Sequence, residues 1–141
     1  KEHDKLVIKK RQLQEKEEAE RKRKRAIEDE AKFKVLKAKF FGLRFTDGFI
    51  EVRVLESVRE VMEEGEALHH CVFTNNYYLK PESLILSARI GDKRIETIEV
   101  DLKTLNVVQS RGACNQNTEY HDRIIGLVEK NTRLIKQKLA S

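Results

Sequence analysis

The chain has 141 residues, of which 38% are charged and 39% hydrophobic, so it is more charged and less apolar than an average globular domain. The formal net charge of +5 belongs to the N-terminal part: residues 1–40 hold 15 basic and 9 acidic side chains (+6), whereas residues 41–141 hold 14 and 15 (−1). The sequence shows no apolar run of about 20 residues, no signal peptide and no cysteine framework, which argues against a membrane-spanning or disulfide-rich secreted protein and favours a cytoplasmic location.

Residues 1–42 are predicted to form a long basic helix or linker that precedes a compact domain of residues 43–141. The first 39 residues contain neither Gly nor Pro and consist largely of Lys, Arg, Glu, Gln and Ala, which are good helix formers. Too few apolar residues interrupt the charges of residues 9–25 to predict a sustained coiled-coil seam. Because the chain does not begin with Met, we expect the helix to join the domain to an upstream segment.

Five consecutive basic residues in this helix form a candidate phosphate-binding patch. They are Arg21, Lys22, Arg23, Lys24 and Arg25. No aromatic residue accompanies them, which argues against recognition of single-stranded bases by stacking. A solvated linker helix and a nucleic-acid contact both remain open as interpretations.

Turn and strand signals follow one another after the helix. Residues 46–48 predict a turn, and residues 49–55 alternate between apolar and charged side chains as a half-buried strand does. Ser57 and Glu60 have the spacing of a capping box, which predicts a short helix that ends at Gly65. A second helical turn is then predicted to carry residues 68–72.

The second half of the chain predicts a three-stranded meander and a final helix. The strands are residues 84–90, 93–102 and 107–111, with Gly91-Asp92 as a hairpin turn. Asn117 or Thr118 is predicted to cap the last helix. The fold class is therefore predicted to be α+β: an antiparallel sheet of about four strands packed by helices, with the long charged helix at the N-terminus.

The sequence His69-His70-Cys71 is the first stretch with chemical potential. Cys71 is interpreted either as a small core residue or as a thiolate that His70 activates. Zinc would require ligands from a wider set, namely His69, His70, Cys71, Cys114 and His121. The spacing of this set matches no compact zinc module, so we predict no metal and no cofactor.

The second stretch is the end of the strand of residues 107–111 and the loop that follows. Gln109 and Arg111 share one face of the predicted strand, Gly112 permits a sharp turn, and Asn115 and Asn117 return amides to the same place. Such a group near a helix N-terminus predicts a binding site for an anion or a phosphate. The alternative is a polar corner in which Arg111 pairs with Glu66 or Glu99. For the two stretches to form one site, Cys71, His70 and Arg111 must meet at a single pocket.

Taken together, the two stretches resemble the PcfJ-like family of conjugative plasmids and other mobile elements, over about residues 57–134. The residues that carry the resemblance are Glu64, Gly65, Glu66, His70, Cys71, Val72, Tyr77 or Tyr78, Ile95–Glu99, Val108, Gln109, Arg111, Gly112, Asn115, Tyr120 and His121. The resemblance implies that His70, Cys71, Gln109, Arg111, Gly112 and Asn115 act as a set. It implies a link to plasmid transfer but no established activity.

Three functional hypotheses follow. The first is a non-enzymatic accessory domain of a mobile element that binds DNA or RNA through the basic helix, or another protein of the transfer machinery. The second is a hydrolase or nuclease in which His70 is the acid or base and Arg111 stabilises an anion, with Cys71 in the same site. The third is a purely structural interaction module.

Overall fold

The computed structural model describes residues 2–70 and 77–141 of the chain, with side chains from residue 4 onward, so the predictions for Cys71 and Val72 lie outside the described residues. The described strands form one antiparallel sheet in the order β1-β2-β3-β4-β5. The strands are β1 (Arg44–Thr46), β2 (Glu51–Val54), β3 (Ser83–Ile90), β4 (Lys93–Asp101) and β5 (Val107–Arg111). The predicted α+β class and its meander are confirmed.

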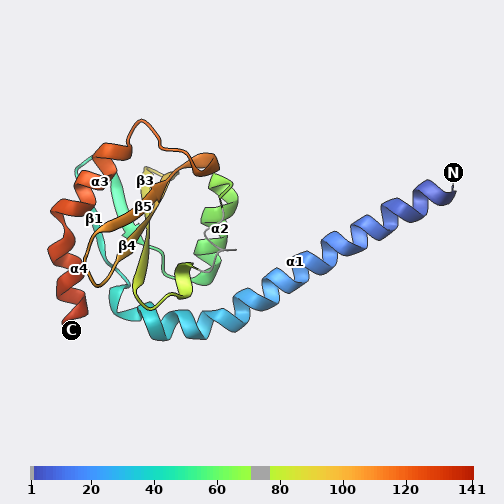
Figure 1. Ribbon diagram of the computed structural model, residues 1–141, viewed down its shortest axis with the longest axis horizontal. Helices are drawn as coiled ribbons and strands as arrows, with labels where there is room; N and C mark the ends of the chain where they lie inside the picture. The colour runs from blue at the N-terminus through green and yellow to red at the C-terminus, as the bar shows by residue number, and fades with distance from the viewer. Residues whose placement is uncertain (1, 71–76) are drawn as a thin grey trace.

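The helices complete the fold (Figure 1). They are α1 (Glu2–Lys37), α2 (Val58–Leu68), α3 (His121–Lys130) and α4 (Thr132–Leu139), and the short 3-10 helices are η1 (Ala38–Phe40), η2 (Tyr77–Leu79) and η3 (Ala113–Asn115). Figure 1 shows α3 and α4 on one side of the sheet and α2 on the other, while the first half of α1 extends away from the compact part.

The sheet has five strands where about four were predicted, because Arg44–Thr46 pairs with β2 ahead of the turn. Three residues are too few to show an alternating pattern, so this strand left no clear signal in the sequence. The turn itself supports the pairing. Asp47 Oδ1 accepts hydrogen bonds from the backbone N–H of Phe49 and of Ile50, at 2.9 and 2.8 Å.

The two faces of the sheet differ in character. Alternate residues of β3 and β4, such as Leu86 and Ile98, pack under α3 and α4 in the larger apolar core. The opposite face carries Ser87, Thr97 and Glu99, all buried, beneath α2 and the end of α1. A smaller apolar cluster lies there as well, made of Phe33, Leu55, Val58, Val61, Tyr78 and Ile85. We call the side of the sheet with Thr97 and Glu99 the polar face.

Helix α2 is longer than predicted. Ser57 Oγ accepts from the Glu60 backbone N–H at 3.0 Å, so the predicted cap is confirmed. The helix does not end at Gly65 but continues to Leu68 and stops at His69, which has a left-handed φ of 51°. A helical Gly costs about 1 kcal/mol relative to Ala, and the burial of Glu64 and Leu68 against the sheet outweighs it. The predicted helical turn over residues 68–72 is therefore wrong for its described part, since His69 and His70 follow the end of the helix.

The C-terminal helix also differs from the prediction. It begins at His121 with Tyr120 as its N-cap, and it is interrupted at Asn131, whose Nδ2 donates to the Leu127 carbonyl at 2.8 Å. Thr118 lies two residues before this N-cap. Its Oγ1 accepts from the Tyr120 backbone N–H at 3.2 Å, while its own backbone N–H and hydroxyl are donated to the buried Glu96 carboxylate at 2.8 and 2.6 Å.

Helix α1 has two parts. The side chains of residues 4–21 are all exposed, whereas Asp29, Phe33 and Lys37 are buried against the compact part. Tyr78 Oη donates to Asp29 Oδ2 at 2.7 Å and fastens the second part in place. Among the described residues, no helix combines the length and apolar character that crossing a membrane requires.

Candidate functional site on the polar face of the sheet

A buried carboxylate joins α2 to the polar face. Glu64 is fully buried, and it accepts hydrogen bonds from Ser87 Oγ at 3.0 Å and from Thr97 Oγ1 at 2.6 Å. Arg94 Nη1 lies 3.2 Å from the same carboxylate. Burial raises the pKa of Glu64, while the hydroxyl donors and the Arg94 charge oppose that rise. The side chains of two strands thus converge on one helical residue.

His70 extends this network by one step. Its Nε2 lies 2.8 Å from Thr97 Oγ1, whose single hydroxyl proton is donated to Glu64. The hydroxyl oxygen must therefore accept a proton from His70, which assigns the Nε2–H tautomer to the ring. Burial lowers the pKa of His70, so the ring is neutral near pH 7. Its other nitrogen, Nδ1, is buried and has no partner among the described residues.

Arg111 lies on the same face as His70. In the antiparallel ladder, Arg111 is the cross-strand neighbour of Thr97, and Gln109 is the neighbour of Glu99. Direct neighbours in such a ladder point to the same side of the sheet. His70 contacts Thr97, and Arg111 is the ladder neighbour of Thr97 on the same face, while Cys71 lies outside the described residues. Whether these residues form one site stays a prediction.

The Arg111 guanidinium is exposed and oriented by an amide. Its Nη1 donates to Asn117 Oδ1 at 2.7 Å, so the predicted approach of Arg111 and Asn117 is observed. The alternative pairing of Arg111 with Glu66 or Glu99 is not found among the described residues. Glu99 instead accepts from Ser83 Oγ at 2.6 Å and from Gln109 Nε2 at 2.8 Å.

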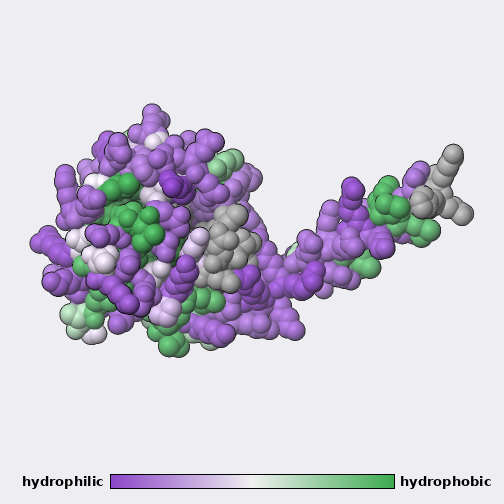
Figure 2. Space-filling view, viewed as in Figure 1, coloured by the Kyte–Doolittle hydropathy of each residue, from purple (hydrophilic) through white to green (hydrophobic). Residues whose placement is uncertain are grey.

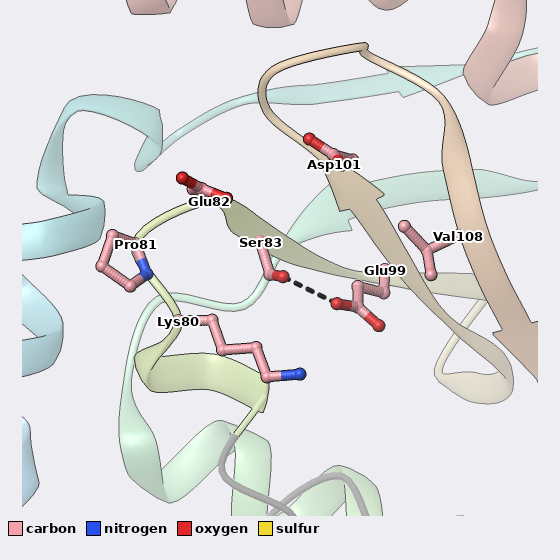
Figure 3. Close-up of a pocket in the computed structure, with 7 residues that line it drawn as sticks. All are labelled: Lys80, Pro81, Glu82, Ser83, Glu99, Asp101 and Val108. Atoms are coloured by element: carbon pink, nitrogen blue, oxygen red, sulfur yellow. Dashed lines mark hydrogen bonds between the residues drawn. The ribbon is translucent and has the colours of Figure 1, made fainter.

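Glu99 lies at the wall of an open pocket of about 410 Å³ (Figure 3). The lining residues are Lys80, Pro81, Glu82, Ser83, Glu99, Asp101 and Val108. Behind the wall, the buried Lys37 donates from Nζ to the backbone carbonyls of Lys80 and Ser83. Burial lowers the pKa of Lys37 from 10.5 to about 8, and the charge of Glu99 opposes that change. The hydrogen bond from Gln109 to Glu99 helps to position the Glu99 carboxylate, which lines this pocket.

The loop after β5 is tightly packed at its first residue, Gly112, whereas residues 113–117 are exposed. A Cβ at Gly112 would lie 2.5 Å from Thr118 Cγ2 and 2.9 Å from the Ile95 carbonyl oxygen, so only glycine fits at this close approach. Cys114 and Asn115 both have left-handed backbones, with φ of 56° and 62°. Asn115 is exposed, and its backbone N–H donates to the Gly112 carbonyl at 3.1 Å. Cys114 is exposed and its thiol is free.

The histidines of the candidate zinc set do not all converge. His121 Nδ1 lies 2.9 Å from Glu96 Oε1. Glu96 precedes Thr97 in β4, and consecutive strand residues point to opposite faces, so the sheet separates His121 from His70. Within the described residues, no group of three or more His, Cys, Asp or Glu side chains is arranged to hold a metal ion.

The sequence analysis did not predict that charged side chains are buried. Among the described residues, the charged side chains that are at most 1% exposed are Glu64, Glu96 and Lys37. Glu64 follows Val61 by three positions on the buried side of α2, which is a core spacing and was the available signal. Glu96 lies in a strand that is buried on both faces. Burial opposes ionisation of Glu96, but donors from Ser110, Thr118 and His121 outweigh it and hold its pKa below the usual range.

The predicted basic patch is divided between two sides of α1. Lys22 Nζ lies 3.6 Å from Glu66 Oε1, and Arg25 Nε lies 3.6 Å from Asp29 Oδ2, so these two residues face the compact part. Arg21, Arg23 and Lys24 are exposed. The solvent-facing part of the patch thus consists of three residues.

These features define a class of protein: a small α+β domain with a buried polar network across one sheet face and a charged helical extension. The chain belongs to the PcfJ-like protein family, whose family model matches residues 1–125. The resemblance noted in the sequence is thereby confirmed, and the match also includes α1 and ends within α3. No curated protein and no solved structure matches the chain.

Proposed function

We propose that this protein is a cytoplasmic accessory protein of a mobile genetic element, such as a conjugative plasmid, and that it binds DNA or RNA through α1. The observation that carries the proposal is that Arg21, Arg23 and Lys24 are exposed on a helix whose preceding residues 4–20 are also exposed. The net charge of +6 over residues 1–40 supports it, since phosphate attraction grows with local positive charge.

The polar face provides a second contact for the same ligand. Arg111 is exposed at the end of β5 and is oriented by Asn117, an arrangement suited to a phosphate or carboxylate oxygen. Gln109 serves a positioning role because its amide is engaged with Glu99, and Gly112 permits the close turn beside it. Asn115, exposed in the same loop, can add an amide donor.

The test is the salt dependence of binding to a DNA duplex and to a single-stranded RNA. Replacing Arg21, Arg23 and Lys24 by Gln should weaken binding and reduce the slope of log K against log salt by about 2 to 3 for the duplex, since each phosphate contact contributes about 0.9. The matched control replaces Lys130, Arg133 and Lys136, three exposed basic residues of the C-terminal helices, by Gln. Equal affinity and slope for both triple variants would refute the role of α1.

A second function, a hydrolase acting on a phosphodiester, is favoured by one specific observation. The chain Glu64–Thr97–His70 orients an imidazole whose buried Nδ1 has no partner among the described residues. A general base needs such a lone pair and also access for the substrate, which this function would require at Nδ1. Arg111 would then stabilise the developing negative charge.

This second function is tested by assaying cleavage of nucleic-acid substrates. His70→Gln and Arg111→Ala should each reduce turnover by at least about 100-fold, the scale of one acid–base or anion-stabilising group. His69→Asn is the matched control, because His69 is exposed and asparagine tolerates its left-handed backbone. Turnover that survives both substitutions would remove His70 and Arg111 from any such mechanism.

A further inference from the structure

The outer side of α1 carries exposed apolar residues along most of its length. Leu6, Leu13, Ile27 and Val35 are 65%, 57%, 76% and 85% exposed. Figure 2 shows hydrophobic surface on α1 near its N-terminal end, well away from the compact part. Val7 and Ile8 are also exposed, at 52% and 56%, but they point to other sides of the helix, so the outer side holds only part of the exposed apolar surface of α1.

Helical geometry places these residues on one face. At about 100° per residue, Leu6, Leu13, Ile27 and Val35 all lie within about 60° of the direction opposite Phe33. Phe33 is buried against the compact part, so this outer face points away from it. Figure 1 agrees, since the compact part lies on one side of α1 only.

Charged residues separate the two apolar groups. Glu17, Glu20, Arg21 and Lys24 line one shallow groove at the middle of the exposed helix. Two acidic residues therefore precede two basic residues along the chain, between Leu13 and Ile27. This stretch holds too few apolar residues to predict a coiled-coil seam, because the residues at its middle are charged.

We propose that the outer face of α1 binds the same face of a second copy of this chain in an antiparallel, two-fold arrangement. Aligning residue i with residue 41 − i places Glu17 opposite Lys24, Glu20 opposite Arg21 and Leu6 opposite Val35. The same alignment places Leu13 opposite Glu28 and Ile27 opposite Gln14, so the ionic pairs carry the contact. Each pair occurs twice, as an isologous contact requires. A parallel alignment would instead bring Glu17 against Glu17 and Lys24 against Lys24, which is repulsive. Charge complementarity therefore favours a second copy of the chain as the partner and an antiparallel arrangement of the two helices.

The pairing is compatible with the rest of the molecule. Helix α1 has 36 residues, about 54 Å at 1.5 Å per residue, so two copies can overlap from Leu6 to Val35. The two compact parts would lie at opposite ends, each on the far side of its own helix. Arg23 projects to the flank, at about 80° from the direction of Phe33, and stays outside the contact. Arg21 and Lys24 lie within it, so in the dimer Arg23 is the residue of the exposed basic group that remains available to nucleic acid.

The experiment measures the mass of the full chain by sedimentation equilibrium, without nucleic acid, so its outcome is independent of the proposed function. The wild-type chain should show a monomer–dimer equilibrium. The double variants E17K/E20K and R21E/K24E should each weaken dimerisation by at least about tenfold, because like charges then face each other. Circular dichroism confirms that each variant keeps its helix.

Two further arms make the test specific. The quadruple variant E17K/E20K/R21E/K24E restores every antiparallel pair with its signs exchanged, so it should dimerise as the wild type does. An equimolar mixture of the two double variants should form a heterodimer, since one then presents only positive and the other only negative charge at the centre. A wild-type chain that stays monomeric at millimolar concentration, or a quadruple variant that fails to recover, would overturn the proposal.

Discussion

A fully buried carboxylate lies on each face of the sheet, Glu96 on one and Glu64 on the other, and these two have different partners. On the side of α3 and α4, Glu96 accepts hydrogen bonds from Ser110, Thr118 and His121, which join β4, β5 and the start of α3. On the polar face, Glu64 binds Ser87 and Thr97, and the network continues to His70, whose Nδ1 has no partner among the described residues. The first network joins three elements at one carboxylate, whereas the second contains a buried ring nitrogen, His70 Nδ1, that has no partner among the described residues.

The difference between the Glu96 and Glu64 networks indicates which face of the sheet carries the candidate site. A carboxylate whose donors all come from the surrounding backbone and side chains holds elements together. A buried ring nitrogen without a partner among the described residues, on the sheet face that also carries the exposed Arg111, marks a candidate site instead.

The largest expected effect is that of removing Glu96. Glu96→Ala leaves the donors of Ser110, Thr118 and His121 without their common acceptor, so the free energy of unfolding should fall by roughly 3 to 5 kcal/mol. Urea denaturation measures the loss. The control Glu119→Ala removes an exposed carboxylate of the same loop and should change stability by less than about 0.5 kcal/mol. A small effect at Glu96 would mean that its network is not structural.

The second effect is a pH dependence from Lys37, on the polar side. The folded-state pKa of about 8 lies below the ordinary 10.5, so between these values the unfolded chain binds more protons than the folded chain. Below pH 8 the buried Lys37 is charged in the folded chain, and the full free-energy cost of burying that charge lowers stability. As pH rises from 8 to 10.5 the folded chain holds Lys37 neutral, so this cost no longer applies and stability rises. Relative to Lys37→Met, the wild type should therefore gain roughly 3 kcal/mol of unfolding free energy across this range. Parallel stability curves for the two proteins from pH 8 to 10.5 would contradict the buried position of the charge.

How much of this could be read from the sequence depends on the range of each interaction. The meander of β3, β4 and β5 was predictable because alternation and turn residues are local signals, and alternation also placed Gln109 and Arg111 on one face. The burial of charged groups was not. Glu64 meets Thr97 33 positions away, and Lys37 meets the Ser83 carbonyl 46 positions away. No window along the chain contains both partners, so only the folded structure identifies them.

The third effect concerns the loop that links the two faces. Gly112→Ala forces a Cβ to within 2.5 Å of Thr118 Cγ2 and 2.9 Å of a backbone carbonyl oxygen, and should cost about 1 to 3 kcal/mol. Gly126→Ala is the matched control: a Cβ there meets nothing within 4 Å, and Ala is favoured over Gly in the interior of α3, so stability should rise by about 0.5 to 1 kcal/mol. Thermal and urea denaturation of both variants give the comparison. Equal effects of the same sign would show that the loop can relax around residue 112.

The smallest effect on stability, yet the most direct test of the Glu64 network, comes from Thr97→Val. The substitution removes the hydroxyl between Glu64 and His70 at nearly constant volume, so the unfolding free energy should fall by only about 1 to 2 kcal/mol.

The effect of Thr97→Val on the tautomer of the His70 ring should be clearer than its effect on stability. Ring ¹⁵N spectra of the wild type should show a neutral His70 protonated at Nε2 at pH 7, because burial lowers the pKa of His70 and Thr97 accepts that proton. In Thr97→Val the ring should lose this single tautomer. Thr118→Val makes the same change on the other face, and there His121 should keep its spectrum, since its Nδ1 contacts Glu96 directly at 2.9 Å. A wild-type His70 that is charged at pH 7, or protonated at Nδ1, would contradict the prediction, because the hydrogen bonds through Thr97 would then not leave a lone pair on Nδ1.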